Sequence, residues 1–266
     1  MASITTQEVL RYPKLSVEVL SFPDVERIFH LTRAENTDWA QLRAPFELAD
    51  HCKIVLKMID AAISRSDGRP EMAVKIRLGI LLDAVHATPP DPESPNSTPI
   101  PISSKCPFLF GPIVYNEVVH CLQGTPDWFL WYGPDAKKGK ESVAINMVIL
   151  ETEHGQSADG VRQTLAYMSM IHTQRRAEGK LDSSVFGLST DNSQFHFLQL
   201  NGESEWSRLD LNYQNHLQEI VGKLAYFHRH ASILSASDRS DDPKKADSVF
   251  HVEDSGRSAV LVAISS

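Results

Sequence analysis

The chain has 266 residues, of which 42% are hydrophobic and 23% are charged, and its formal net charge is −8. This length and composition predict one large globular domain, alone or with appendages, that is able to bury a sizeable core. Non-specific nucleic-acid binding usually requires a strongly basic surface. The negative net charge of this chain gives no support to such a surface over the whole protein. A local basic groove stays open as an alternative.

The cysteines and the apolar runs indicate a cellular compartment. Cys52, Cys106 and Cys121 match no zinc spacing, which favours a reducing environment. The N-terminal stretch MASITTQEVLRYPKLS lacks the apolar core of a secretory signal, and no apolar run reaches the roughly 18 to 20 residues of a membrane helix. We therefore expect a soluble intracellular protein, cytoplasmic or nuclear, with no membrane partner.

The first third of the chain is predicted to be helical. Apolar residues recur at helical spacing over residues 46–64, and residues 71–86 form a second helix with Pro70 at its start. Since this second helix is apolar nearly all round, we expect it to be buried. Residues 1–86 are thus an N-terminal helical part, and the Pro/Ser-rich residues 87–105 are predicted to be a loop.

Strands and helices alternate through the second half. Apolar residues on both alternating faces of residues 143–152 predict a central strand that is covered on both sides. The other predicted elements are strands at 127–133, 183–190, 194–201 and 206–211, and helices at 158–177 and 213–230. Residues 233–266 are predicted to be a disordered tail, whose last residues are either a weak edge strand or no element. The order predicts an α/β or α+β fold, a central mixed sheet flanked by helices.

The predicted central strand ends in VILETEHG, which contains two carboxylates. Glu151 and Glu153 are two residues apart and project to the same side of a strand. Carboxylates at a buried position are costly unless a cation compensates them, and Mg²⁺ prefers such oxygen ligands. Asp127 opens the preceding aromatic strand, and a hairpin would bring it beside Glu151. The alternative is that the two glutamates mark where the strand reaches water and that Asp127 is a turn residue.

These residues carry a resemblance. Pro126-Asp127, followed by Glu151-Thr152-Glu153 and then by QTLAY from Gln163 to Tyr167, resembles the PD-(D/E)XK phosphodiesterase superfamily with the Q-x-x-x-Y helix of its exonuclease-like branch. A group of fungal nuclease-like proteins has a similar succession of segments. In this chain the segments are DWFLWYG, VILETE, RQTLAYMSMIH, SSVFGLSTD and FHFLQL. The resemblance covers about residues 110 to 232.

The resemblance implies a restriction-endonuclease-like core over residues 106–232 and a hydrolase that cleaves DNA or RNA. It implies that Asp127 and Glu151 hold Mg²⁺ or Mn²⁺, with the Thr152 carbonyl as an added ligand. It further implies that Gln163 and Tyr167, which share one helix face, bind substrate or support the acids.

One position departs from the superfamily. Glu153 stands where the superfamily has a lysine that orients the attacking water. Glu153 supplies no positive charge, but it can accept a proton from that water or bind metal. Two alternatives follow, an active metal-dependent nuclease or a catalytically inactive nuclease fold that binds nucleic acid or protein.

Several other residues have two interpretations. Lys137, Lys138 and Lys140 lie in the turn between the two acidic strands and are candidate phosphate contacts or simply a solvated turn. Glu71, at the start of the second helix, is a candidate accessory acid. His228 and His230 are predicted to lie at the C-terminal end of a helix, where they would interact favourably with the helix dipole.

Overall fold

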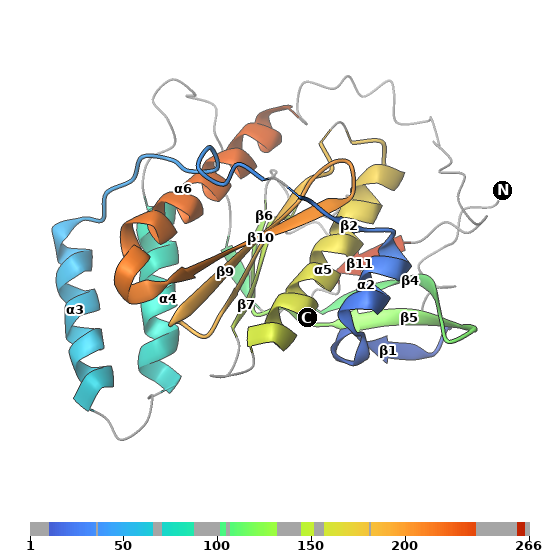
Figure 1. The fold of residues 1–266 in the computed structure, drawn as a ribbon, viewed down its shortest axis with the longest axis horizontal. Helices are drawn as coiled ribbons and strands as arrows, with labels where there is room; N and C mark the ends of the chain where they lie inside the picture. The colour runs from blue at the N-terminus through green and yellow to red at the C-terminus, as the bar shows by residue number, and fades with distance from the viewer. Residues whose placement is uncertain are drawn as a thin grey trace.

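Two mixed β-sheets with helices between and beside them form the α+β fold seen in a computed structural model of the chain (Figure 1). The structure describes residues 11–35, 37–65, 71–87, 102–104, 107–131, 145–151, 157–180, 182–237 and 260–263. Within these ranges, none of the helices is both long and apolar enough to cross a membrane.

The bounds of the elements are as follows. The helices are η1 (Val17–Val19, 3-10), α2 (Phe22–Phe29), α3 (Asp50–Arg65), α4 (Glu71–His86), α5 (Ser157–Ala177) and α6 (Tyr213–Ser237). The strands are β1 (Lys14–Ser16), β2 (Thr32–Arg33), β3 (Ile102–Ser104), β4 (Phe108–Tyr115), β5 (Val118–Gly124), β6 (Trp128–Trp131), β7 (Ile145–Glu151), β8 (Val185–Thr190), β9 (Gln194–Leu200), β10 (Glu205–Asn212) and β11 (Val260–Ala263).

The seven-stranded sheet has the order β2-β10-β9-β8-β7-β6-β3. The sheet is mixed, because the β7–β8 and β10–β2 pairs are parallel while the β6–β7, β8–β9 and β9–β10 pairs are antiparallel. A parallel pair needs a crossover, and α5 supplies it between β7 and β8. The four-stranded sheet has the order β1-β5-β4-β11 and is built around the β4–β5 hairpin.

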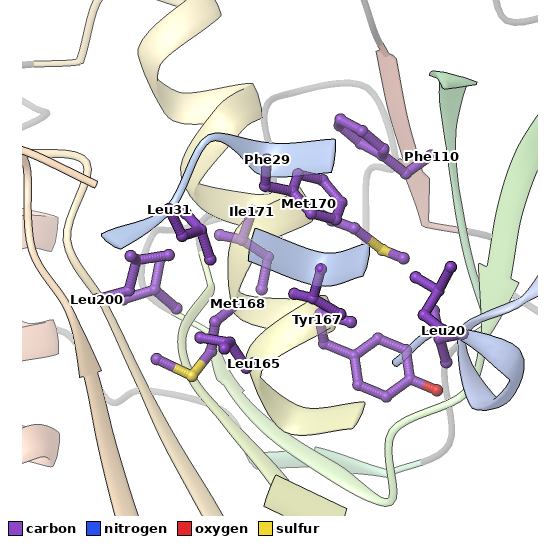
Figure 2. Close-up of a cluster of buried hydrophobic side chains, with 14 of the residues drawn as sticks. Leu20, Phe29, Leu31, Phe110, Leu165, Tyr167, Met168, Met170, Ile171 and Leu200 are labelled. Atoms are coloured by element: carbon purple, nitrogen blue, oxygen red, sulfur yellow. The ribbon is translucent and has the colours of Figure 1, made fainter. Parts of the chain in front are cut away.

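Helix α5 is buried between the two sheets (Figure 1). It presents apolar residues in several directions, and Leu165, Met168 and Ile171 are all fully buried. A helix that is covered on more than one side needs this all-round apolar sequence rather than one apolar stripe. Figure 2 shows the cluster around α5, to which Leu20 and Phe29 from the N-terminal segment, Phe110 from β4 and Leu200 from β9 contribute.

A second apolar cluster covers the opposite face of the seven-stranded sheet. Ile149 of β7 and Phe186 and Leu188 of β8 pack there against α4 and α6. The Phe186 ring stacks on the Phe227 ring of α6, with 4.2 Å between centroids. The predicted central strand with both faces covered is thus found in β7, which lies inside the sheet between α5 and α6.

Most of the predicted elements are confirmed. The helix predicted at 71–86 has the observed bounds, and the strands and helices predicted from residue 127 onward are all present within a few residues. Helix α6 is longer than predicted and continues to Ser237. His228 and His230 therefore lie inside the helix, and their predicted placement at its end is wrong.

The N-terminal and C-terminal predictions need correction. Residues 11–35 are not only helical, because β1 pairs with β5 and β2 pairs with β10. Ile102–Ser104 of the predicted loop form β3, which pairs with β6. Val260–Ala263 of the predicted tail form β11 against β4, the strand alternative for that segment. Residues 88–101, 238–259 and 264–266 lie outside the described part.

The β4–β5 hairpin was missed because its pattern is interrupted. Gly111 and Pro112 divide the apolar residues of β4, and the pairing with β5 shifts register between Phe110 and Ile113. Glycine and proline argue against a strand interior, except at a bulge of this kind.

Candidate functional site

Asp127 and Glu151 lie at the same end of two neighbouring strands. β6 and β7 are antiparallel, with Trp128 opposite Ile149. Asp127 directly precedes β6, and Glu151 is the last residue of β7. The prediction that these two strands are neighbours is confirmed. The side chain of Glu151, and therefore the distance between the two carboxyl groups, lies outside the described part.

Tyr167 of α5 lies beneath the segment that leads into Asp127. Its ring is buried and its hydroxyl faces Gly124, where an added methyl group would overlap it. Burial raises the pKa of the Tyr167 phenol; a hydrogen bond with the Thr125 backbone opposes this rise, and the Asp127 carboxylate adds to it. The Tyr167 hydroxyl is therefore close to the Thr125 backbone and within electrostatic range of the Asp127 carboxylate. In this position Tyr167 supports the Asp127 segment from below.

The other predicted site residues differ in how far the structure describes them. Gln163 lies on α5 one turn before Tyr167 and is half-buried. Glu71 is the first residue of α4, and its side chain lies outside the described part. The remaining predicted residues, Thr152, Glu153, Lys137, Lys138 and Lys140, are outside it altogether. Trp128 is partly buried and packs against the cluster around α4 and α6.

Within the described residues, no group of three or more His, Cys, Asp or Glu side chains is placed to hold a metal ion. Two of the predicted acids are not included in that statement, since the side chain of Glu151 and all of Glu153 are outside the description. Asp127 is half-buried.

A polar cavity of about 320 Å³ opens at the same end of the seven-stranded sheet. Glu151 pairs with Thr190, and the cavity begins a few residues further on, at the turn between β8 and β9. Hydroxyl, amide and charged side chains dominate its lining. They are Asp60, Ser64, Arg77, Ser193, Gln194, Asn212, Tyr213 and Gln214.

Arg77 is the cation of this cavity and is held on three sides. Its Nη1 donates to the Asn192 carbonyl at 2.8 Å, and its guanidinium carbon lies 4.3 Å from the centroid of the Tyr213 ring. Its Nε is 3.5 Å from Asp60 Oδ1, which is an ion pair without hydrogen-bond geometry. Sequence reasoning missed Arg77, because a lone arginine in an apolar helix gives no sign of which turn or aromatic ring it will meet.

A row of polar residues crosses the face of the sheet that α5 covers. His196 Nδ1 lies 2.7 Å from Asp210 Oδ1, and Ser189 is directly opposite His196 on the next strand. The order serine, histidine, aspartate is that of a hydrolase triad. However, Ser189 is completely buried, and neither its Oγ nor His196 Nε2 has a hydrogen-bond partner in the described structure. A substrate cannot reach this hydroxyl, so the row is not a nucleophilic site in the observed fold.

His86 and His228 form a partly buried polar contact between α4 and α6. His86 Nδ1 and His228 Nε2 are 3.2 Å apart. Burial, and to a lesser degree the charge of His86, lowers the pKa of His228 to about 4. At neutral pH His228 is therefore uncharged.

Comparison of the chain with protein-family models and with curated proteins found no match. The case for a function thus depends on the residues and geometry described above.

Proposed function

We propose that the chain is a PD-(D/E)XK nuclease-like protein with a restriction-endonuclease-like core, and that it is a metal-dependent phosphodiesterase acting on DNA or RNA. The observation that carries the proposal is the pairing of β6 with β7, because it puts Asp127, in the bend before β6, and Glu151 at one end of adjacent strands, one register position apart. An Asp and a Glu on neighbouring strands supply carboxylate oxygens, the donors that Mg²⁺ and Mn²⁺ prefer.

In the proposed chemistry, two of the three acids bind the metal and the third accepts a proton. Asp127 and Glu151, with the Thr152 carbonyl, would hold the metal. A divalent metal held there would supply Lewis acidity to a phosphate oxygen and to a water molecule. Glu153 accepts the proton of the attacking water, a role in which a carboxylate can replace the expected lysine. Lys137, Lys138 and Lys140 supply positive charge to the substrate backbone.

The contact between Tyr167 and the Asp127 segment supports this assignment. A metal site needs carboxylates whose positions are fixed by their surroundings. Gly124 and the Thr125 backbone, just before Asp127, contact the buried Tyr167 side chain, and Tyr167 belongs to α5, which packs between the two sheets. Tyr167 is therefore a positioning residue in this proposal, while the half-buried Gln163 one turn earlier remains open to substrate.

The polar cavity gives the substrate a second point of contact. It opens at the same sheet end as Asp127 and Glu151 and contains Gln194, Gln214 and the buried Arg77. Amide side chains read base edges, and hydroxyl groups and arginine bind phosphate oxygens. Under this proposal Gln194→Ala and Gln214→Ala raise KM for a nucleic-acid substrate and leave kcat nearly unchanged.

A catalytically inactive nuclease fold is the second candidate, and one observation favours it. Glu153 adds negative charge at the position where the superfamily has a cation. Such a protein would bind nucleic acid or another protein through the same surface and would cleave nothing.

A cleavage assay distinguishes the two candidates. Wild type, Asp127→Ala and Glu153→Lys are incubated with single-stranded and double-stranded DNA and RNA in Mg²⁺ or Mn²⁺. An active enzyme cleaves at least one substrate as wild type and loses this activity by roughly 100-fold or more on removal of a metal ligand. If wild type is inactive on all four substrates and Glu153→Lys is active, the inactive fold is the correct assignment. Inactivity of both proteins contradicts the nuclease proposal.

A further inference from the structure

Helix α3 exposes an apolar face to solvent. Ile54 is 59% exposed, Val55 41% and Met58 67%, the highest values among the large apolar residues of the helix. Ala61 and Ala62 on the next turn are also exposed. These five residues are called the α3 stripe. An exposed run of apolar side chains on one helix face marks an interaction surface more often than chance exposure does.

The spacing of the stripe is that of a helix-pairing seam. His51, Ile54, Met58, Ala61 and Arg65 follow one another at steps of three, four, three and four residues. This alternation keeps side chains on one line along an α-helix and is the spacing found in coiled coils. The seam is apolar at its centre and carries polar residues only at its two ends.

Within the part of the chain that the structure describes, the rest of the fold leaves this face exposed. Figure 1 shows α3 as the outermost element on one side of the molecule, with α4 as its neighbour. Leu56 is the only residue of α3 that is fully buried, and it lies on the side opposite Met58. Helix α3 thus uses one face against the protein and presents the stripe on the other.

We propose that the α3 stripe pairs with the α3 stripe of a second copy of this chain, in antiparallel orientation and with Met58 at the two-fold axis. A two-fold interface must be complementary to itself. Rotation about Met58 places Ile54 against Ala62 of the second copy and Val55 against Ala61. Each large side chain then meets a small one, which is the arrangement that lets two helices approach closely.

The charges at the ends of α3 agree with the antiparallel orientation. Asp50 opens the helix and Arg65 closes it, so an antiparallel copy brings these opposite charges together. Lys53 already lies 3.4 Å from Asp50, but the Asp50 side chain is 93% exposed and open to a second cation. A parallel pair would instead set Arg65 against Arg65 and Asp50 against Asp50.

The size of the helix sets the strength of the dimer. Sixteen residues make a helix about 24 Å long, and pairing two of them buries less than the roughly 1,200 Å² of a standard stable interface. We therefore expect a weak dimer that dissociates on dilution.

Sedimentation velocity of the full chain tests the proposal, from roughly 1 to 200 µM, a range that spans the affinities of small interfaces. Wild type is expected to change from monomer to dimer across this range. Met58→Glu and Ile54→Gln should remain monomeric, and since both side chains face solvent, circular dichroism should show them folded. Val118→Glu, at an equally exposed apolar position on β5, should dimerise as wild type does.

A charge exchange tests the orientation. Arg65→Asp should weaken the dimer about tenfold, and the double variant Asp50→Arg with Arg65→Asp should restore it. A wild type that is monomeric at all concentrations, or a dimer that survives Met58→Glu, overturns the proposal. Failure of the double variant to restore association overturns the antiparallel arrangement.

Discussion

The Tyr167 hydroxyl occupies the space that a side chain at Gly124 would need. A methyl group there would overlap the hydroxyl and would lie 2.7 Å from Val17 Cγ2. We predict that Gly124→Ala destabilises the fold by about 1–3 kcal/mol, the usual cost of overpacking a dense core. Urea denaturation measures the change in the free energy of unfolding.

Gly79→Ala is the matched control for this substitution. Gly79 lies in α4, and an added methyl group there meets nothing within 4 Å. Since alanine is a better helix former than glycine, this variant should be up to about 1 kcal/mol more stable than wild type. Equal loss of stability in the two variants would show that the contact with Tyr167 does not restrict residue 124.

Arg162 ties the N-terminal segment to α5. Its Nη1 donates to the carbonyl oxygens of Val17 and Leu20, and its Nη2 lies 3.2 Å from Asp159 Oδ1. We predict that Arg162→Met lowers the free energy of unfolding by about 2–4 kcal/mol, because two buried carbonyl groups lose their donor. Arg162→Lys should recover only part of this loss, since an ammonium group lacks the fork geometry of a guanidinium.

Arg27 provides the comparison for Arg162. It forms an ion pair with Asp24 at 3.0 Å, but its side chain is 57% exposed. Arg27→Met should change the free energy of unfolding by less than about 0.5 kcal/mol, as is usual for exposed pairs. If Arg27→Met and Arg162→Met lowered the free energy of unfolding by similar amounts, this result would contradict the role assigned to Arg162.

Acid should destabilise the fold through His228. Its pKa in the folded protein is about 4, against an ordinary value of 6.5. As the pH falls below 6.5, His228 becomes protonated in the unfolded chain but stays neutral in the folded chain. The free energy of unfolding that is present above pH 6.5 is therefore lost progressively between pH 6.5 and pH 4. The loss amounts to ~3 kcal/mol at most. His172 and His230, whose pKa values burial also lowers, act in the same direction.

Denaturation at a series of pH values tests this prediction. His228→Gln should flatten the pH dependence of the free energy of unfolding between pH 6.5 and 4. A His228→Gln profile with the wild-type slope would assign the acid sensitivity to other groups.

The second half of the fold could be predicted from sequence because its pattern is local. The apolar faces of β7, the turn at Asp191 and Asn192 and the positive φ of Gly179 after α5 are each encoded by a few neighbouring residues. Strand β7 is apolar on both faces because α5 and α6 cover it, and that pattern indicated a central strand directly.

The missed parts depend on distant partners. Strands β2 and β3 contain two and three residues, too few to show a period, and they form by pairing with β10 and β6. For the site, the sequence could place Asp127 and Glu151 on adjacent strands. It could not show that Tyr167 lies beneath Asp127 or that Arg77 meets Tyr213, because these contacts join residues from separate elements.

The central claim is that Asp127 contributes to a divalent-metal site at the ends of β6 and β7. Calorimetric titration with Mn²⁺ tests it most directly, because it needs neither a known substrate nor catalytic activity. Wild type should bind one Mn²⁺, Asp127→Asn should bind it at least about tenfold more weakly, and Glu203→Gln, at an exposed acid remote from the site, should bind it as wild type does. Absence of Mn²⁺ binding by wild type, or equal affinity in wild type and Asp127→Asn, would contradict the account.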